Sequence, residues 1–275
     1  MASDIQAAIP SPTGNTRLFA HVGHPIAQVR APQLVNKLFA ERGIDAVMVA
    51  VDVTPTDLAA TLDGLQRIAN LDGILVTVPH KVAVCAHAQR LAPAVELSGA
   101  ANALRRDTDG RWAAENFDGS GFVQGLRASD FDARGRHVVL VGAGGAGAAI
   151  AASLVLAGVQ SLAVRDVDTQ RAVDLVTRLN RYRAGAAVAA SDADFGRADL
   201  VVQATPLGMA PEDPLPLPLD ALASSALVAD IVMRPARTRL LEAAAARGLA
   251  THEGRHMLDP QISMYADFFI GAHSA

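Results

Sequence analysis

Three glycines in the middle of the chain have the spacing of a phosphate-binding turn. They are Gly142, Gly144 and Gly147, a G-x-G-x-x-G pattern that follows the apolar run 138–141. The first glycine permits the tight turn, the second lets a pyrophosphate approach the backbone, and the third lets helix and strand pack closely. The free N–H groups and the positive end of the helix dipole would hold the phosphates. The pattern predicts a dinucleotide-binding site.

The kind of dinucleotide follows from the residues after the next apolar strand, 161–164. Asp166 lies at the distance from the glycines where an acid that binds the ribose is expected. A carboxylate there accepts hydrogen bonds from both ribose hydroxyls and repels a 2′-phosphate, whereas an NADP site usually has an arginine after the strand. Because Val167 and Asp168 follow instead, we expect NAD in preference to NADP. The alternatives are a phosphate held by Arg165 or Arg171, and Asp166 acting only as a helix N-cap.

A later loop, 204–209, also leaves the carboxyl end of a strand, where open α/β sheets bind ligands. The residues expected to contact the cofactor are therefore Gly142, Ala143, Gly144, Gly145, Ala146, Gly147, Asp166, Val167, Ala204, Thr205, Pro206 and Met209.

Composition limits the classes of protein to which the chain can belong. It has 275 residues, 51% of them hydrophobic, and a net charge of -4. We therefore expect two domains with substantial cores and no nucleic-acid partner. Cys85 is the only cysteine, so no intramolecular disulfide forms. The stretch 138–164 carries no charge and could span a bilayer by length, but its glycines and alanines argue against a membrane helix.

The N-terminal residues bear on where the protein is located. Residues 1–16 lack a positive start followed by an apolar run, and we expect a loose arm and a cytoplasmic protein.

Of 24 basic residues only Lys37 and Lys81 are lysines. In a chain that nearly always uses arginine, a lysine marks a position where a compact ammonium has a use.

Strands and helices alternate along the whole chain, which predicts an α/β fold. We expect two domains: an N-terminal α/β substrate domain with a mostly parallel sheet, and a Rossmann-like dinucleotide-binding domain that contains the glycine turn. In the first of them strands are expected at 17–22, 46–51 and 73–78, and a helix from 81 to about 91. Polar residues stand at the ends of these elements, namely Thr77, Lys81, Asn102, Asp118 and Gln261.

With these residues the chain resembles the shikimate/quinate dehydrogenase family. The matching motifs occur in the family's order over residues 17–270. They are Gly23-His24-Pro25-Ile26, Val76-Thr77-Val78-Pro79-His80-Lys81, Gly99-Ala100-Ala101-Asn102-Ala103-Leu104, Asn116-Phe117-Asp118-Gly119, Gly142-Ala143-Gly144-Gly145-Ala146, Ala204-Thr205-Pro206-Leu207-Gly208-Met209, and Met257-Leu258 with Gln261.

The resemblance implies a substrate-binding and catalytic domain of residues 1–117 with 255–275, a cofactor domain of residues 118–254, and a site in the cleft between them. It implies that Lys81 and Asp118 are the catalytic pair and that Thr77, Asn102 and Gln261 contact the substrate. Reduction of a ketone needs a hydride at carbon and a proton at oxygen, and a lysine beside a carboxylate can supply that proton. The alternative is that Lys81 is a surface residue and Asp118 an N-cap.

The departures from the family's pattern concern the substrate. The family has two serines that hold the substrate carboxylate where this chain has Val29 and Ala31. Its asparagine before Val-Thr is replaced by Leu75, its threonine before Asp118 by Phe117, and its tyrosine after Asp230 by Met233. We expect shikimate or quinate to bind poorly unless Arg30 or His24 supplies new donors, because a buried carboxylate without partners costs several kcal/mol.

The sequence thus predicts an NAD(P)-dependent oxidoreductase that transfers hydride reversibly between a nicotinamide cofactor and a cyclic hydroxy acid like shikimate or quinate, or a related alcohol. One alternative is a dinucleotide-binding sensor or partner-binding protein without redox activity, and another is authentic shikimate dehydrogenase with a rearranged site. The partners expected are a small-molecule substrate, neither nucleic acid nor membrane, and at most a second copy of the chain.

Overall fold

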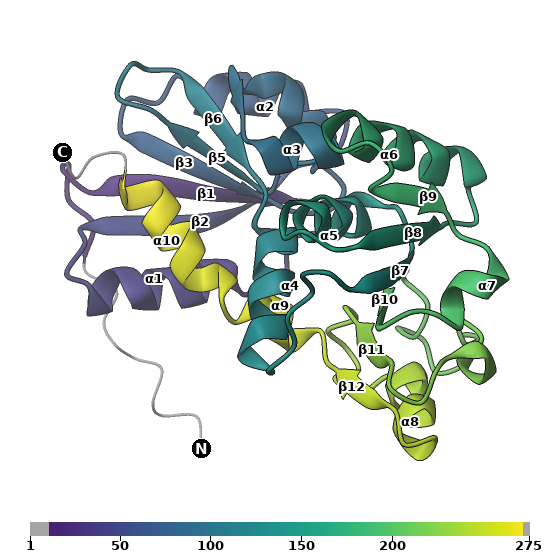
Figure 1. Ribbon diagram of the computed structural model, residues 1–275. Coiled ribbons are helices and arrows are strands. Elements are labelled where there is room, and N and C mark those ends of the chain that lie inside the picture. Colours follow the sequence, from purple (N-terminus) through teal and green to yellow (C-terminus); the bar gives the residue numbers. More distant parts are fainter. Residues whose placement is uncertain (1–10, 272–275) are drawn as a thin grey trace, which may run out of the picture. The chain divides into compact units, whose positions relative to one another are not determined.

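The computed structural model describes residues 11–271, which form two compact units, each built on a six-stranded sheet (Figure 1). Unit 1 comprises residues 11–95, 100–117 and 261–271, and unit 2 comprises residues 96–99 and 118–260. The expected α/β fold class is confirmed, because both sheets carry helices on their faces. Part of the expected N-terminal arm, residues 1–10, lies outside the described residues.

Unit 2 keeps two short segments that the sequence placed in the other domain. The guanidinium of Arg178 donates to the carbonyl oxygens of Leu97 and Ser98, at 3.2 and 3.3 Å, which ties residues 96–99 to unit 2. A Cβ added to Gly125 would touch the backbone of His256, so the segment around His256 packs closely against unit 2 as well. The C-terminal return into unit 1 therefore begins at Gln261 rather than at residue 255.

The sheet of unit 1 has the strand order β2-β1-β3-β5-β6-β4. β1 is parallel to both β2 and β3, whereas β5 is antiparallel to β3 and β6. The bounds are β1 (Arg17–Gly23), β2 (Ala46–Asp52), β3 (Leu71–Val76), β4 (Arg90–Leu91), β5 (Ala103–Arg106) and β6 (Trp112–Glu115). A helix was expected from 81 to about 91, which was wrong. A 3₁₀ helix, η1 (Ala83–His87), is followed by β4, whose partner β6 lies further along the chain.

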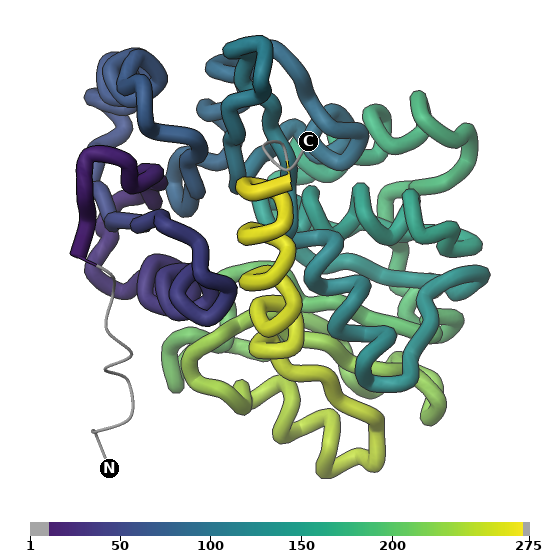
Figure 2. Tube along the Cα trace, turned by 90° about the vertical axis from the view of Figure 1, so that its left-hand side faces the viewer, coloured from purple at the N-terminus to yellow at the C-terminus, as the bar shows by residue number. Residues whose placement is uncertain are grey.

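Helices cover both faces of this sheet. α1 (Ala31–Glu41) and α10 (Gln261–Gly271) lie side by side on one face, as Figures 1 and 2 show, and α2 (Leu58–Leu65) covers the other. Side chains of β1 alternate between the two faces. Phe19 packs with α1 and α10, while Ala20 and Val22 pack with α2. α10 reaches the sheet closely, since a Cβ on Gly73 would strike the ring of Phe269.

Unit 2 has an all-parallel sheet in the order β12-β11-β10-β7-β8-β9. Because β7 lies between β8 and β10, the strand order reverses there, and this is where open α/β sheets bind ligands. The strands are β7 (His137–Val141), β8 (Ser161–Arg165), β9 (Ala187–Ala189), β10 (Leu200–Gln203), β11 (Leu227–Asp230) and β12 (Ala250–His252). The helices are α4 (Phe117–Ala128), α5 (Gly145–Leu156), α6 (Thr169–Tyr182), α7 (Asp192–Phe195), η2 (Leu219–Ala221), α8 (Arg239–Ala246) and α9 (Arg255–Leu258), while α3 (Pro93–Ser98) begins in unit 1 and ends in unit 2.

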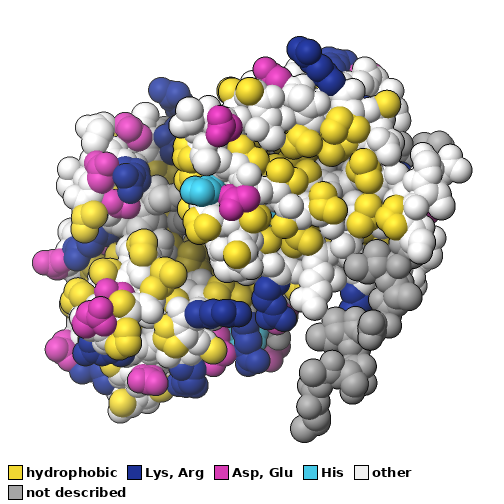
Figure 3. Space-filling view, turned by 180° about the vertical axis from the view of Figure 1, so that it is seen from behind, with side chains coloured by type: hydrophobic (Ala, Val, Ile, Leu, Met, Phe, Trp, Pro, Cys, Tyr) yellow, Lys and Arg dark blue, Asp and Glu magenta, His cyan; other side chains and the backbone are white. Residues whose placement is uncertain are grey.

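The uncharged stretch 138–164 forms β7, α5 and β8, and α5 contributes to the largest apolar cluster of unit 2. Among residues 11–271 no helix is both long and apolar enough to cross a membrane. The face of the molecule in Figure 3 carries hydrophobic side chains among both basic and acidic ones.

Candidate active site

The glycine turn after β7 has the geometry that its spacing predicts. Gly142 has φ +104, and a Cβ there would lie 2.7 Å from the backbone of Ala204. A Cβ on Gly147 would strike the carbonyl oxygen of Gly142. Gly144 differs, because nothing lies within 4 Å of its Cβ position. The outer glycines thus allow close packing, and the middle one leaves open space where a phosphate can approach.

The first turn of α5 also fits an anion. Its N-cap is Gly144, so no side chain caps the N–H groups of the helix start, and Gly144, Gly145 and Ala146 are partly exposed. Uncapped N–H groups at a helix start attract phosphate oxygens. The residues present therefore fit the diphosphate of a dinucleotide.

Asp166 holds the loop beside this turn through hydrogen bonds to the backbone. Its carboxylate accepts the N–H of Ala143 at 2.7 Å and that of Asp168 at 2.8 Å, and its side chain is only 6% exposed. The guanidinium of Arg171 lies 3.9 Å from Asp166 and 3.5 Å from Asp168. Both oxygens of Asp166 thus accept hydrogen bonds from its own chain, while Asp168 caps α6. Val167 is fully exposed.

The loop after β10 is held by a residue that the sequence did not reveal as important. Gln203 is fully buried, and its amide donates to the carbonyl oxygens of Thr205 and Leu207, at 2.9 and 2.7 Å. Its side-chain oxygen accepts the N–H of Thr205 at 2.8 Å. Met209 is exposed at the end of the loop. A polar residue at the end of an apolar strand was the available signal for Gln203.

In unit 1 the predicted motifs meet at the carboxyl ends of β1 and β3. The N–H of Thr77 donates to Val22 at 2.9 Å, and that of Val76 donates to the carbonyl oxygen of Asn102 at 2.8 Å. The carbonyl oxygen of Lys81 accepts the N–H of Ala101 at 2.8 Å. The backbone thus brings Thr77, Lys81 and Asn102 to one edge of the sheet.

Asn102 and Gln261 belong to one buried hydrogen-bond chain. The amide of Asn102 donates to the hydroxyl of Tyr265 at 3.1 Å, and this hydroxyl donates to the side-chain oxygen of Gln261 at 2.6 Å. The oxygen of Asn102 accepts the N–H of Phe117 at 2.9 Å. Tyr265, which the sequence analysis missed, lies one helical turn after Gln261 and thereby links the two predicted residues.

The positions that depart from the family pattern are apolar in the structure too. Ala31 and Leu75 belong to the same apolar cluster, with Leu75 2% exposed, and Val29 is partly buried. Nearby, the imidazole of His24 is 2.8 Å from the carboxylate of Asp52. Arg30 is exposed at the N-cap of α1.

The remaining predicted residues lie in unit 2. Asp118 is 4% exposed in the first turn of α4, and Met233 is 40% exposed after β11. The motif needs a glycine at position 119, because a Cβ there would strike Ala149 and Ser153 of α5.

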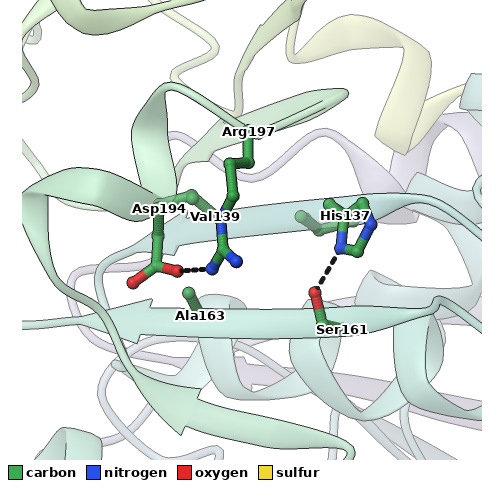
Figure 4. Close-up of a pocket in the computed structure, with 7 residues that line it drawn as sticks. His137, Val139, Ser161, Ala163, Asp194 and Arg197 are labelled. Carbon is green, nitrogen blue, oxygen red and sulfur yellow. Dashed lines mark hydrogen bonds and ion pairs between the residues drawn. The ribbon is translucent and has the colours of Figure 1, made fainter.

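A small pocket elsewhere on unit 2 is a different feature (Figure 4). It lies at the amino ends of β7 and β8, where His137 and Ser161 are joined by a 2.7 Å hydrogen bond, and Arg197 pairs with Asp194. The glycine turn follows the carboxyl end of β7. This pocket is therefore not the predicted cofactor site.

Comparison with known proteins finds relatives that cover most of the chain. Residues 22–104 match the family model of the shikimate dehydrogenase substrate binding domain. Shikimate dehydrogenase (NADP(+)) of Rubrobacter xylanophilus is 39% identical over 91% of this chain and 89% of that protein. The shikimate dehydrogenase (NADP(+)) of Symbiobacterium thermophilum is 36% identical over 94% of this chain and 90% of its own length.

Two solved structures are similar over nearly the whole chain. Shikimate 5-dehydrogenase of Listeria monocytogenes, in complex with shikimate and NAD, has a TM-score of 0.87 and 28% identity and covers 94% of this chain and 93% of its own. The ligand-free 5-ketofructose reductase of a Gluconobacter strain has a TM-score of 0.82 and 28% identity and covers 94% of both chains.

The expectation that NAD is preferred over NADP was wrong. The curated relatives are named as NADP(+) enzymes. The expectation assumed that Asp166 offers a free carboxylate, whereas both of its oxygens accept backbone N–H groups and Arg171 lies beside it. An arginine at this edge of the sheet can accommodate a 2′-phosphate.

Replacing Arg171 with alanine is therefore expected to raise the Kd for NADPH about tenfold and to change the Kd for NADH little, because a charge-assisted contact to phosphate is lost. The measurement is titration of both dinucleotides by fluorescence. Arg165→Ala is the matched control, since Arg165 pairs with Asp192 and lies over the ring of Phe195. Equal weakening of NADPH and NADH would contradict this role.

Proposed function

The chain belongs to the shikimate dehydrogenase family of NAD(P)-dependent oxidoreductases, and from this premise we propose that its substrate is an uncharged polyhydroxy ketone, together with the alcohol formed from it. One observation carries the proposal. The positions at which the family pattern has hydrogen-bond donors for a carboxylate hold Val29, Ala31 and Leu75 here.

The energetic reason is the cost of burying a charge. A carboxylate moved from water to an apolar site without hydrogen-bond partners loses several kcal/mol. Leu75 and Ala31 supply only methyl groups, so their side chains offer a carboxylate no hydrogen-bond donor. An uncharged hydroxyl or carbonyl group does not meet this penalty.

A structural relative supports the same substrate class. The Gluconobacter protein with a TM-score of 0.82 is called a 5-ketofructose reductase, and its name describes the reduction of a keto sugar. A fold of this kind therefore accommodates a substrate without a carboxylate. This is the reason to choose a keto sugar as the first compound for testing.

In the proposed mechanism Lys81 and Asp118 form the acid–base pair. When bound, the nicotinamide supplies the hydride that reaches the carbonyl carbon. The ammonium of Lys81 gives a proton to the carbonyl oxygen and takes it back in the reverse direction, so that charge does not remain on oxygen. Asp118, held at the start of α4 with 4% exposure, orients the lysine and a hydroxyl of the substrate.

Steady-state kinetics test the substrate class. NADPH consumption is followed with 5-ketofructose, 3-dehydroshikimate and 3-dehydroquinate. We expect kcat/KM for the keto sugar to exceed that for either acid at least about 100-fold, because a buried carboxylate finds no partner. Higher turnover of 3-dehydroshikimate would contradict the proposal. In that case Arg30→Ala shows whether Arg30 supplies the missing hydrogen-bond donor to the carboxylate. If it does, the substitution abolishes the turnover of 3-dehydroshikimate.

A further inference from the structure

His21 is a buried polar residue that the sequence analysis did not single out. It lies in β1, two residues after Phe19, and is 6% exposed. Its Nδ1 has no hydrogen-bond partner among the described residues. A buried polar atom without a partner is costly, and it calls for an explanation in a folded protein.

The position of His21 places it with the substrate motifs of unit 1. Residues two apart on a strand share a face, so His21 points to the same side of the sheet as Phe19, toward α1 and α10. In the pairing of β1 with β3, His21 lies opposite Leu75. The side chain of Leu75 has no polar atom, but His21 provides one at the opposite position of the neighbouring strand.

A second buried atom without a partner belongs to the same layer. The Nε2 of Gln261 makes no hydrogen bond among the described residues, and Gln261 is 2% exposed. Its oxygen is bound to Tyr265, which in turn binds Asn102. The carbonyl oxygen of Asn102 accepts the N–H of Val76. Val76 in turn lies opposite Val22 on β1, and Val22 directly follows His21.

The imidazole of His21 is neutral at neutral pH. Burial, and after it the positive charge of Lys81, lowers the pKa of His21 to about 4. A neutral imidazole has one nitrogen that donates and one that accepts. A hydroxyl group both donates and accepts, so it matches an Nδ1 that accepts together with an amide that donates, whereas a carboxylate only accepts.

We infer that His21 determines substrate specificity: its Nδ1 accepts a hydrogen bond from a substrate hydroxyl, and the Nε2 of Gln261 donates to the oxygen of the same hydroxyl. The inference rests on the proposed function, because it explains how an uncharged polyhydroxy compound is selected.

The test compares His21→Leu with His21→Asn in reduction of 5-ketofructose by NADPH. Leucine removes the polar atom, whereas asparagine places an amide oxygen near the position of Nδ1. We expect His21→Leu to raise KM about 20-fold with kcat changed less than about threefold, and His21→Asn to recover most of the loss. The melting temperature of His21→Leu is expected not to fall, because a buried atom without a partner has been removed.

Asn36→Leu is the matched control for loss of a buried polar side chain in unit 1. Asn36 makes two hydrogen bonds to the backbone of Met48, at 2.9 and 2.7 Å. This control should lower the melting temperature and leave KM unchanged.

The outcomes separate the inference from the proposed function. If the wild-type protein reduces 5-ketofructose and His21→Leu has an unchanged KM, the inference is wrong while the proposed function stands. Failure of His21→Asn to recover KM would overturn the hydrogen-bond role. If the wild-type protein reduces 3-dehydroshikimate but not the keto sugar, the proposed substrate class is wrong and the inference falls with it.

Discussion

Replacing Lys81 with alanine is expected to lower kcat for ketone reduction about a thousandfold, because the carbonyl oxygen then receives its proton from water rather than from a positioned ammonium. The Kd for NADPH should stay within about twofold of the wild-type value, since the phosphates of the dinucleotide are expected to bind the turn 142–147 and not the side chain of Lys81. Rapid mixing under single-turnover conditions separates the chemical step from product release.

Lys37→Ala is the matched control for this experiment. Lys37 is the only other lysine of the chain, and it lies on the surface of α1, 3.7 Å from Glu41, with a side chain 58% exposed. An exposed pair of this kind contributes little, so both turnover and stability should be unchanged. If Lys81→Ala keeps wild-type turnover, Lys81 is not the proton donor.

The second large effect concerns the glycine turn, where two alanine substitutions should separate binding from folding. Gly147→Ala is expected to lower the free energy of unfolding by about 3 kcal/mol, because the new Cβ would overlap the carbonyl oxygen of Gly142, which packs against the start of α5. Gly144→Ala should leave stability nearly unchanged, since Gly144 has φ -70 and open space around its Cβ position.

For Gly144→Ala the expected loss is in cofactor affinity. A methyl group there occupies the space through which a pyrophosphate approaches the backbone, so the Kd for NADPH should rise about 30-fold. Denaturant unfolding without cofactor and fluorescence titration measure the two quantities separately. A Gly144→Ala protein that binds NADPH as tightly as the wild type would show that phosphates do not approach at this glycine.

Much of the fold followed from local pattern. The apolar run that stops at Gly142 predicted a buried strand, a turn and a helix, and β7 and α5 are found there. Such a segment is specified by residues next to one another in the chain. The helix expected from 81 to about 91 failed for the opposite reason. Arg90 and Leu91 are extended because they pair with Ala113 and Ala114, and no local window contains that partner.

The motifs of the candidate site could be predicted from the sequence, but the residues that hold these motifs in place could not. Asp166 fits the spacing of a ribose-binding acid, yet spacing does not show that backbone N–H groups already occupy its oxygens. Tyr265 and Gln203 act through contacts with loops that periodicity cannot reveal. His21 was open to prediction, because a histidine two residues after Phe19 breaks the apolar face of an otherwise buried strand.

The position of α10 in the chain has a consequence for biosynthesis. Phe269 covers Gly73, and its ring centroid lies 4.9 Å from that of Phe19, so the apolar face of β1 and β3 is closed by a helix that is translated only after all the strands of both sheets. Unit 2 is encoded almost entirely between these two partners. Before the ribosome has added α10, unit 2 can already be folded, whereas the face of β1 and β3 stays open to chaperones and proteases.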